Sequence, residues 1–284
     1  KTLLVSEIKI EKLLDTSKVY SLWKKSKQRS IFTNPNLLEK FHFDFDWWVA
    51  KKGDKQICLW PICLKKKEVI LPNFFYYFGP LWLLDDFEEK KEFRLVLDTY
   101  NKYIDKLYSE YQKIHNQLHF SLQDVRSFDW HNYDGNPKFK IFVKYTAIKE
   151  DLFDANMDNI VKKFRYVRRN EMKKFSNIED LTITNKIKFD DLFRLYIETV
   201  GINNVDKNTE YTLKNFDDLI KQNNGSYIVI KKKHTIISVA MLINDEKNSN
   251  LILNLNDKKF RRKGSNSFLV KEILDYCVKK KIDI

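Results

Sequence analysis

The sequence predicts an α/β (α+β) protein of two lobes, each a mixed, mostly antiparallel sheet flanked by helices. The order of the expected elements supports this: helices, an antiparallel meander, a long helix and a strand follow one another, and a similar order recurs in the second half. The composition agrees, because 284 residues can form two cores and a chain with 43% hydrophobic residues is expected to fold. We expect an N-terminal lobe over 1–150 and a C-terminal lobe over 151–284.

The first half opens with a strand and two helices. SKVYSLWKKS (17–26) has helical spacing, and a second helix is expected after Asn34 as N-cap, with Pro35 at its first position. Aromatic and β-branched runs then predict an antiparallel meander whose first two strands are joined by a KGDK turn. The three strands are expected at 47–51, 56–64 and 69–78.

A long helix and a short strand complete the first half. From Glu88, apolar residues recur at steps of three and four, which is the spacing of one helix face. The residues of this stripe are Phe93, Leu97, Tyr100, Ile104, Leu107, Tyr111 and Ile114. LHFSL at 118–122 is predicted to be a strand.

The second half is predicted to contain three helices, a three-stranded meander and a final helix. The helices are expected at 156–176, 189–200 and 209–222, and the strands at 226–232, 235–244 and 250–256. A short KKH turn near Lys233 joins the first two strands. The last helix, 264–280, is expected to direct Phe268, Ile273, Tyr276 and Cys277 inward.

Charge and cysteine content limit the class of protein. A net charge of +13 predicts attraction to polyanions, although compositional drift toward lysine would give the same value. Three cysteines without a C-x-x-C pair indicate neither a disulfide framework nor a cysteine zinc site. The aromatic segment at 69–84 is interrupted by two prolines and a glycine, so we interpret it as buried sheet rather than membrane contact. We expect a cytoplasmic protein with no transmembrane segment, and a peripheral place at the inner membrane face stays open.

The segment NDKKFRRKGSNSFLVKEIL (256–274) predicts a phosphate-binding turn. A strand ends near Asn256, a basic loop follows, and Gly264 opens a helix. The start of a helix offers free backbone N–H groups and a partial positive charge, and a glycine allows close approach of a ligand. The alternative is an exposed turn in which Ser265 or Asn266 only caps the helix.

A second basic stretch, KKFRYVRRNEMKKF (162–175), is a candidate for substrate binding. On one continuous helix, Lys162, Arg165 and Arg169 would share a face, with Arg168 beside them, while Phe164, Val167 and Phe175 would lie nearer the apolar side. Arginine can hold phosphate oxygens in pairs, so these cations could bind an anionic substrate group. A solvated helix face is the alternative.

The residues Arg261, Arg262, Lys263, Gly264, Ser265 and Asn266 resemble the R/Q-x-x-G-x-G/A loop of GNAT-fold acyltransferases. In that family the backbone N–H groups of this loop hold the pyrophosphate of acyl-CoA. The resemblance therefore implies acyl-CoA as co-substrate and these six residues as its binding site. Asn266 departs from the pattern, because a larger side chain in place of Gly or Ala would narrow the CoA groove.

The whole chain resembles more specifically the Fem-type branch of this fold, which includes peptidoglycan aminoacyltransferases. The order of several strings carries the likeness: IFTNPNLLEKF, AKKGDKQICLWPICL, FFYYFGPLW, SFDWHNY, the basic stretch at 162–175 and LFRLYIETVGINNVDKNTEYTLKNF. The resemblance implies two GNAT-like lobes that transfer an acyl or aminoacyl group from CoA or tRNA to an amine, which is small or linked to an anionic carrier, in bacterial surface-polymer synthesis. It also implies that relatives continue past KKKIDI, so Asp283 is expected to begin a strand, and two alternatives stay open: the chain is a fragment truncated in its C-terminal lobe, or its site is incomplete.

Acyl transfer to an amine requires stabilisation of an oxyanion and removal of a proton. GNAT-like sites use backbone N–H groups where two strands splay, and by position those strands would be 235–244 and 250–256. Weak candidates for a general base are Asp245, Asp257 and Glu272, each of which is otherwise an ordinary exposed carboxylate.

Other chemistries have less support in the sequence. His115 and His119 have the spacing of a helical metal pair but no third ligand, so no metal is expected. Cys277 is expected to be packed, and most tryptophans lie in apolar runs that favour the core over base stacking. The alternative functions are a non-catalytic nucleic-acid-binding module and an inactive structural relative of the fold. The donor, the acceptor amine and the oligomeric state are not indicated by the sequence.

Overall fold

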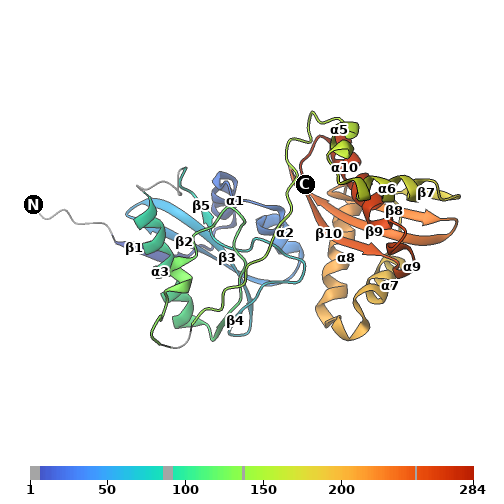
Figure 1. The fold of residues 1–284 in the computed structure, drawn as a ribbon. Coiled ribbons are helices and arrows are strands. Elements are labelled where there is room, and N and C mark those ends of the chain that lie inside the picture. The colour runs from blue at the N-terminus through green and yellow to red at the C-terminus, as the bar shows by residue number, and fades with distance from the viewer. Residues whose placement is uncertain (1–6, 86–91, 136–137, 247) are drawn as a thin grey trace, which may run out of the picture. The chain divides into compact units, whose positions relative to one another are not determined.

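The computed structural model describes residues 7–85, 92–135, 138–246 and 248–284. The chain forms two compact units, Lys1–Thr146 and Ala147–Ile284, which we describe separately (Figure 1). Each unit has its own sheet and its own hydrophobic core.

The first unit contains a sheet whose main path runs β1-β2-β3-β4-β6, with β5 paired to β3. The strands are β1 (Ile8–Lys12), β2 (Asp44–Lys52), β3 (Lys55–Lys65), β4 (Glu68–Val69), β5 (Leu81–Trp82) and β6 (Lys113–Ile114). The helices are α1 (Thr16–Lys25), η1 (Ile31–Thr33), α2 (Pro35–Lys40), α3 (Phe93–Glu110) and α4 (Arg126–Asp129). The expected cap of α2 is confirmed, because the Asn34 side chain accepts a hydrogen bond from the backbone N–H of Asn36.

Helices cover both faces of this sheet. Successive strand residues point to opposite faces, so Trp48 and Trp60 pack in the cluster with α3, whereas Val49 and Leu59 pack with α1. The hydroxyl of Tyr103 on α3 donates to backbone oxygens of the sheet, which satisfies the one polar group of that ring in the core.

Two strand predictions in the first unit are wrong. The strand expected at 69–78 ends at Val69, and an irregular turn follows in which Phe74 and Tyr77 have φ of 63° and 57°. Phe75 and Phe78 of this turn still pack in the core, whereas Phe74, Tyr76 and Tyr77 are partly exposed, so burial was inferred correctly in part and the strand period was not. The segment 118–122 forms no strand. The strand that follows α3 is β6 instead, which pairs with β4 in parallel. The predicted beginning of the long helix, at 88, lies outside the described residues.

The second unit contains an antiparallel sheet in the order β10-β9-β8-β7. The strands are β7 (Leu181–Thr184), β8 (Gly225–Lys232), β9 (Thr235–Asn244) and β10 (Ser249–Asn256). The helices are α5 (Met157–Lys162), α6 (Tyr166–Ser176), α7 (Phe189–Val200), η2 (Ile202–Asn204), α8 (Lys207–Lys221), α9 (Lys258–Arg261) and α10 (Ser265–Lys280). The α+β fold class and the lobe architecture expected from the sequence are confirmed.

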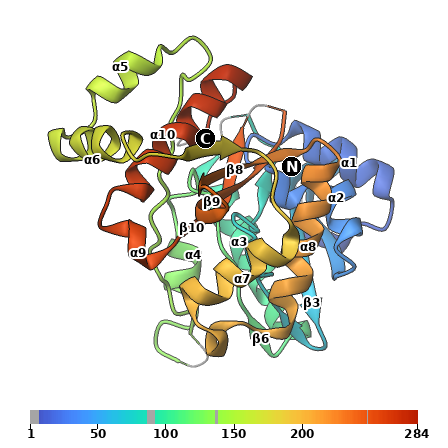
Figure 2. The same cartoon turned by 90° about the vertical axis from the view of Figure 1, so that its right-hand side faces the viewer.

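Helix α10 packs on one face of this sheet beside α6, whereas α7 and α8 contact β10 and β8 (Figure 2). Phe268, Ile273 and Cys277 face the core as predicted. Asp283 begins to pair with the sheet as expected, in a single parallel bridge to Asn248. Among the described residues, no helix is both long and apolar enough to cross a membrane.

The helix expected over 156–176 is wrong as one element. It is interrupted at 163–165, where the N–H of Lys163 and the N–H of Phe164 bond to carbonyls of the last turn of α5. The sequence analysis also missed β7 and α9, which are four residues long each.

Candidate functional site

The basic turn at the end of β10 is built by one helix cap and one glycine. The Oδ1 atom of Asp257 accepts a hydrogen bond of 2.7 Å from the backbone N–H of Lys259 and so starts the short helix α9. Gly264 follows with φ of 94°, a conformation that favours glycine, and α10 begins at the next residue.

A buried hydrogen-bond network holds the start of α10 against the sheet. Oδ1 of Asn256 accepts from the hydroxyl of Ser238 at 2.8 Å and from the hydroxyl of Ser265 at 3.0 Å. Nδ2 of Asn256 donates to Oδ1 of Asn254 at 2.8 Å and to Oδ1 of Asn266 at 3.2 Å. Asn256 therefore joins β9, β10 and the first turn of α10, a role that sequence analysis missed although this asparagine ends an apolar strand.

Asn266 is an exposed residue, and its side-chain oxygen accepts the bond from Asn256. This contact draws the side chain toward the end of β10. The concern raised by the sequence, that Asn266 would fill a groove meant for a ligand, is reduced by this orientation.

The first turn of α10 has unused backbone donors. Within the described residues, no oxygen accepts a hydrogen bond from the N–H of Ser265, Asn266 or Ser267, whereas the N–H of Phe268 bonds to the carbonyl of Gly264. Three free N–H groups at the positive end of a 16-residue helix form a ready site for an anion.

Helix α6 occupies the open side of Gly264. A Cβ atom at this position would lie 2.9 Å from both Cβ and the carbonyl oxygen of Glu171. The glycine is therefore required for close packing of α6 on α10, and a ligand cannot use that side of it. The contact also brings the basic stretch 162–175 next to the basic turn 258–263, although about ninety residues separate them in sequence (Figure 2).

Side chains reinforce this contact between the helices. The hydroxyl of Ser267 donates to the carboxylate of Glu171, and an NH1 atom of Arg168 lies 2.8 Å from the same carboxylate. The Ser267 hydrogen bond and Arg168 together hold the pKa of Glu171 below its usual value. Glu171 thus stays ionised beside the start of α10 and pairs with one cation of this surface, Arg168.

The predicted substrate-binding cations do not share one helix face. Lys162 ends α5, Arg165 precedes α6, and an NH1 atom of Arg169 donates to the carbonyl of Lys162 across the break. Val167, expected on the apolar side, is 62% exposed, whereas Phe175 is buried as predicted. In contrast, Arg261, Arg262 and Lys263 are all exposed at the turn before α10.

The three candidate bases lie apart and serve local roles. Asp245 accepts from the N–H of Asn248 in the turn before β10, and Asp257 caps α9 at the opposite end of that strand. Glu272, on α10, forms an ion pair of 2.7 Å with its neighbour Lys271. The structure does not bring these carboxylates together.

The expected splaying of the strands 235–244 and 250–256 is wrong. β10 pairs with β9 from Ser249 to Asn256, opposite Asn244 to Ser238, and this register is interrupted by a β-bulge between Leu251 and Leu253, which leaves Ile252 outside it. In addition, Asp283 approaches the other edge of β10, since its carbonyl accepts from the N–H of Ser249 at 2.6 Å.

Cys277 and His119 pack against neighbouring side chains, whereas His115 is exposed. Cys277 is fully buried in the core, and burial raises the pKa of its thiol to about 12, which removes nucleophilic thiolate at neutral pH. His119 lies in contact with the rings of Tyr77 and Phe120. Within the described ranges, no three side chains that could ligate a metal come together.

Comparison with solved structures shows the fold of the chain. FemX matches with a TM-score of 0.57 and 11% identity, over 96% of this chain and 88% of FemX. A tandem GNAT protein from the clavulanic acid biosynthesis pathway matches with a TM-score of 0.49 and 8% identity, over 97% of this chain and 87% of that chain. No protein-family model and no curated protein matches the sequence.

Proposed function

On the premise that this chain has the fold of FemX, a fold of GNAT-like lobes, we propose that it is an acyltransferase. It would transfer an acetyl or aminoacyl group from a CoA or tRNA carrier to an amine. The acceptor class we propose is an amine on a small or carrier-linked precursor of a bacterial surface polysaccharide or of peptidoglycan.

The observation that carries this proposal is the turn from β10 into α10. Three free N–H groups at Ser265, Asn266 and Ser267 follow directly after the exposed cations Arg261, Arg262 and Lys263. A pyrophosphate or an RNA phosphate placed there would accept hydrogen bonds from the N–H groups and pair with the guanidinium groups. Both donor carriers present this chemistry.

The transfer itself forms a C–N bond and breaks a C–S or C–O bond. The nitrogen of a neutral amine attacks the carbonyl carbon of the donor, and the thiol or the ribose hydroxyl leaves with the proton that the amine loses. The β-bulge of β10 leaves Ile252 out of register four residues before Asn256, so its N–H is a candidate donor to the carbonyl oxygen during attack. We assign no general base, because none of the three predicted carboxylates lies free at this place.

Thermal unfolding with and without acetyl-CoA tests the donor site. A ligand at 100 times its dissociation constant stabilises the folded chain by about 2.7 kcal/mol, so the midpoint should rise by a few degrees. The double variant Arg261→Ala/Arg262→Ala should lose this shift. The matched control is Lys279→Ala/Lys280→Ala, which removes two charges at the other end of the same helix and should keep it.

The alternative functions predict other outcomes. A nucleic-acid-binding module would show no shift with acetyl-CoA and would bind RNA or DNA with an affinity that falls by orders of magnitude between about 50 and 200 mM salt. An inactive relative of the fold would show neither response. Either result would contradict the proposal of an acyl-CoA transferase, and binding restricted to aminoacyl-tRNA would identify the other donor.

A further inference from the structure

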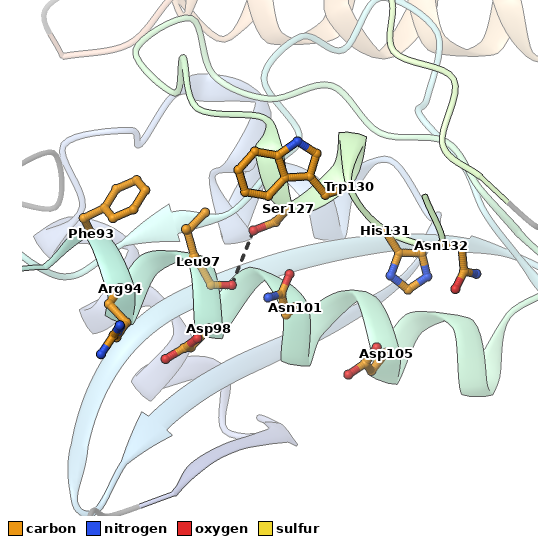
Figure 3. A pocket seen from close by; sticks show the side chains of 10 residues that line it. All are labelled: Phe93, Arg94, Leu97, Asp98, Asn101, Asp105, Ser127, Trp130, His131 and Asn132. Carbon is orange, nitrogen blue, oxygen red and sulfur yellow. Dashed lines mark hydrogen bonds between the residues drawn. The ribbon is translucent and has the colours of Figure 1, made fainter. Parts of the chain in front are cut away.

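The first unit has a groove along the exposed side of α3. All the residues that line it belong to the first unit. Its volume is about 620 Å³. Helix α3 forms one side of it, and α4 with the turn at 130–132 forms the other (Figure 3). It is lined by Phe93, Arg94, Leu97, Asp98, Asn101, Asp105, Ser127, Trp130, His131 and Asn132. The lining residues on α3 extend from Phe93 to Asp105, or about 18 Å along the helix axis.

An exposed tryptophan forms one wall of this groove. Trp130 is 56% exposed, and Figure 3 shows its indole above Leu97, with the hydroxyl of Ser127 bonded to the Leu97 carbonyl beneath. Trp48, Trp60 and Trp82 are at most 1% exposed, so the expectation of core tryptophans holds for them and not for Trp130. The guanidinium carbon of Arg126 lies over the Trp130 ring, 5.6 Å from its centroid, so one face of the indole already has a partner and the other face is the flat surface for a ligand.

The polar side chains of the groove supply both donors and acceptors. Asp98 and Asp105 are exposed carboxylates, and among the described residues neither has a lysine or arginine nitrogen within 4.0 Å. The guanidinium of Arg94 donates, and the amide of Asn101 can do both. Figure 3 shows the Asn101 side chain directed between Trp130 and His131.

The balance of charge in the groove limits the ligand. Two carboxylates and one guanidinium give the lining a formal charge of −1 on a chain of net charge +13, so the groove lacks the cluster of cations that would select a phosphate group. A purely apolar ligand would leave the carboxylates and amides without partners. The lining suits a neutral ligand with many hydroxyl groups and one apolar face.

We propose that this groove binds a neutral oligosaccharide. The C–H face of a sugar ring would lie on the indole of Trp130, whose π face attracts the partly positive hydrogens. Hydroxyl groups of the same and neighbouring rings would donate to Asp98 and Asp105 and exchange hydrogen bonds with Asn101. The length of the groove exceeds one ring, so a linear chain of two or three sugars is the expected ligand. The proposal does not depend on acyl transfer.

Quenching of tryptophan fluorescence by acrylamide tests the proposal on the full chain. Trp130 is the most exposed tryptophan, so it accounts for most of the quenchable emission. The probes are three soluble neutral trisaccharides: chitotriose, cellotriose and maltotriose. We expect at least one to reduce quenching, with a dissociation constant near the millimolar range that weak single-site recognition gives, about −4 kcal/mol.

Matched variants identify the groove as the site. Asp98→Ala/Asp105→Ala should weaken the effect of that sugar at least tenfold, whereas Asp54→Ala, in the turn between β2 and β3, should leave it unchanged. Trp130→Ala should abolish binding of the sugar measured by calorimetry, with the far-ultraviolet circular dichroism spectrum unchanged. Failure of all three sugars to protect Trp130 would overturn the proposal, as would protection by spermidine alone or protection unaffected by the double variant.

Discussion

His119 is a partly buried side chain in the first unit. Its Nδ1 atom lies 2.9 Å from the hydroxyl of Ser121 and accepts a hydrogen bond from the backbone N–H of the same residue at 3.2 Å. Burial lowers the pKa of His119 to about 4, from an ordinary value near 6.5. The fold therefore excludes the proton that the unfolded chain would take up.

This pKa predicts a loss of stability in acid. The unfolded state binds more protons than the folded state between about pH 6.5 and pH 4, so the free energy of unfolding should fall as the pH decreases through that window, by up to roughly 3 kcal/mol. The variant His119→Asn places an amide oxygen where Nδ1 stands and removes the titration. Urea unfolding at pH 7 and pH 4.5 should show a smaller difference for the variant, and an equal difference would contradict the assignment.

The geometry of the basic turn depends on the contact between helices α6 and α10. Gly264 both reverses the chain and lets the backbone of Glu171 approach, and the Asn256 network fixes the same turn from the side of the sheet. The direction of the three free N–H groups follows from these two constraints. A substitution of Gly264 or of Asn256 should therefore alter the affinity for an anion, although neither substitution removes a positively charged side chain.

Gly264→Ala should be strongly destabilising. The new Cβ would lie 2.9 Å from the carbonyl oxygen of Glu171 and would also force a side chain into φ of 94°, which together should cost at least about 2 kcal/mol in the free energy of unfolding. Gly135→Ala is the control, since a Cβ there meets nothing within 4 Å. If both variants unfold at the same urea concentration, the packing role of Gly264 is wrong.

The elements differ in how much of them the sequence could predict. Most of the longer elements were predicted, because apolar residues recur along each of them with the period of a strand or of a helix. These elements are β2, β3, β8, β9, β10, α1, α3, α7 and α10. The strand predicted after Val69 is wrong, because this segment is a turn with two positive φ values. The break at 163–165 was not predicted, because charged residues continue through it and no glycine or proline marks the end of a helix there.

The candidate site was predictable in its parts and not in its arrangement. The strand, the basic turn and the start of α10 are readable from the letters around Gly264. The role of Asn256 and the approach of Glu171 depend on contacts between residues far apart in the chain, which a single sequence does not show. The same is true of the groove beside Trp130, since the sequence favoured the core for most tryptophans.

For the whole molecule, the two units present different chemistry. The second unit places five exposed cations, at 258, 259 and 261–263, before the start of α10, whereas the groove of the first unit is slightly acidic and carries an exposed aromatic ring. A protein of net charge +13 attracts polyanions in general, and the start of α10 combines this charge with free backbone donors at the end of a strand. The proposed transferase activity therefore depends on the second unit, and the proposed sugar binding on the first.

Amide chemical shifts of the full chain provide the most direct experiment on the donor site. On titration with acetyl-CoA, the amide resonances of Ser265, Asn266 and Ser267 should move most, because their N–H groups would gain phosphate acceptors. Amides at the opposite end of α10, near Lys280, should stay in place. If these three resonances remain unchanged while the ligand binds elsewhere, or if no resonance moves at saturating acetyl-CoA, the start of α10 is not an acyl-CoA site.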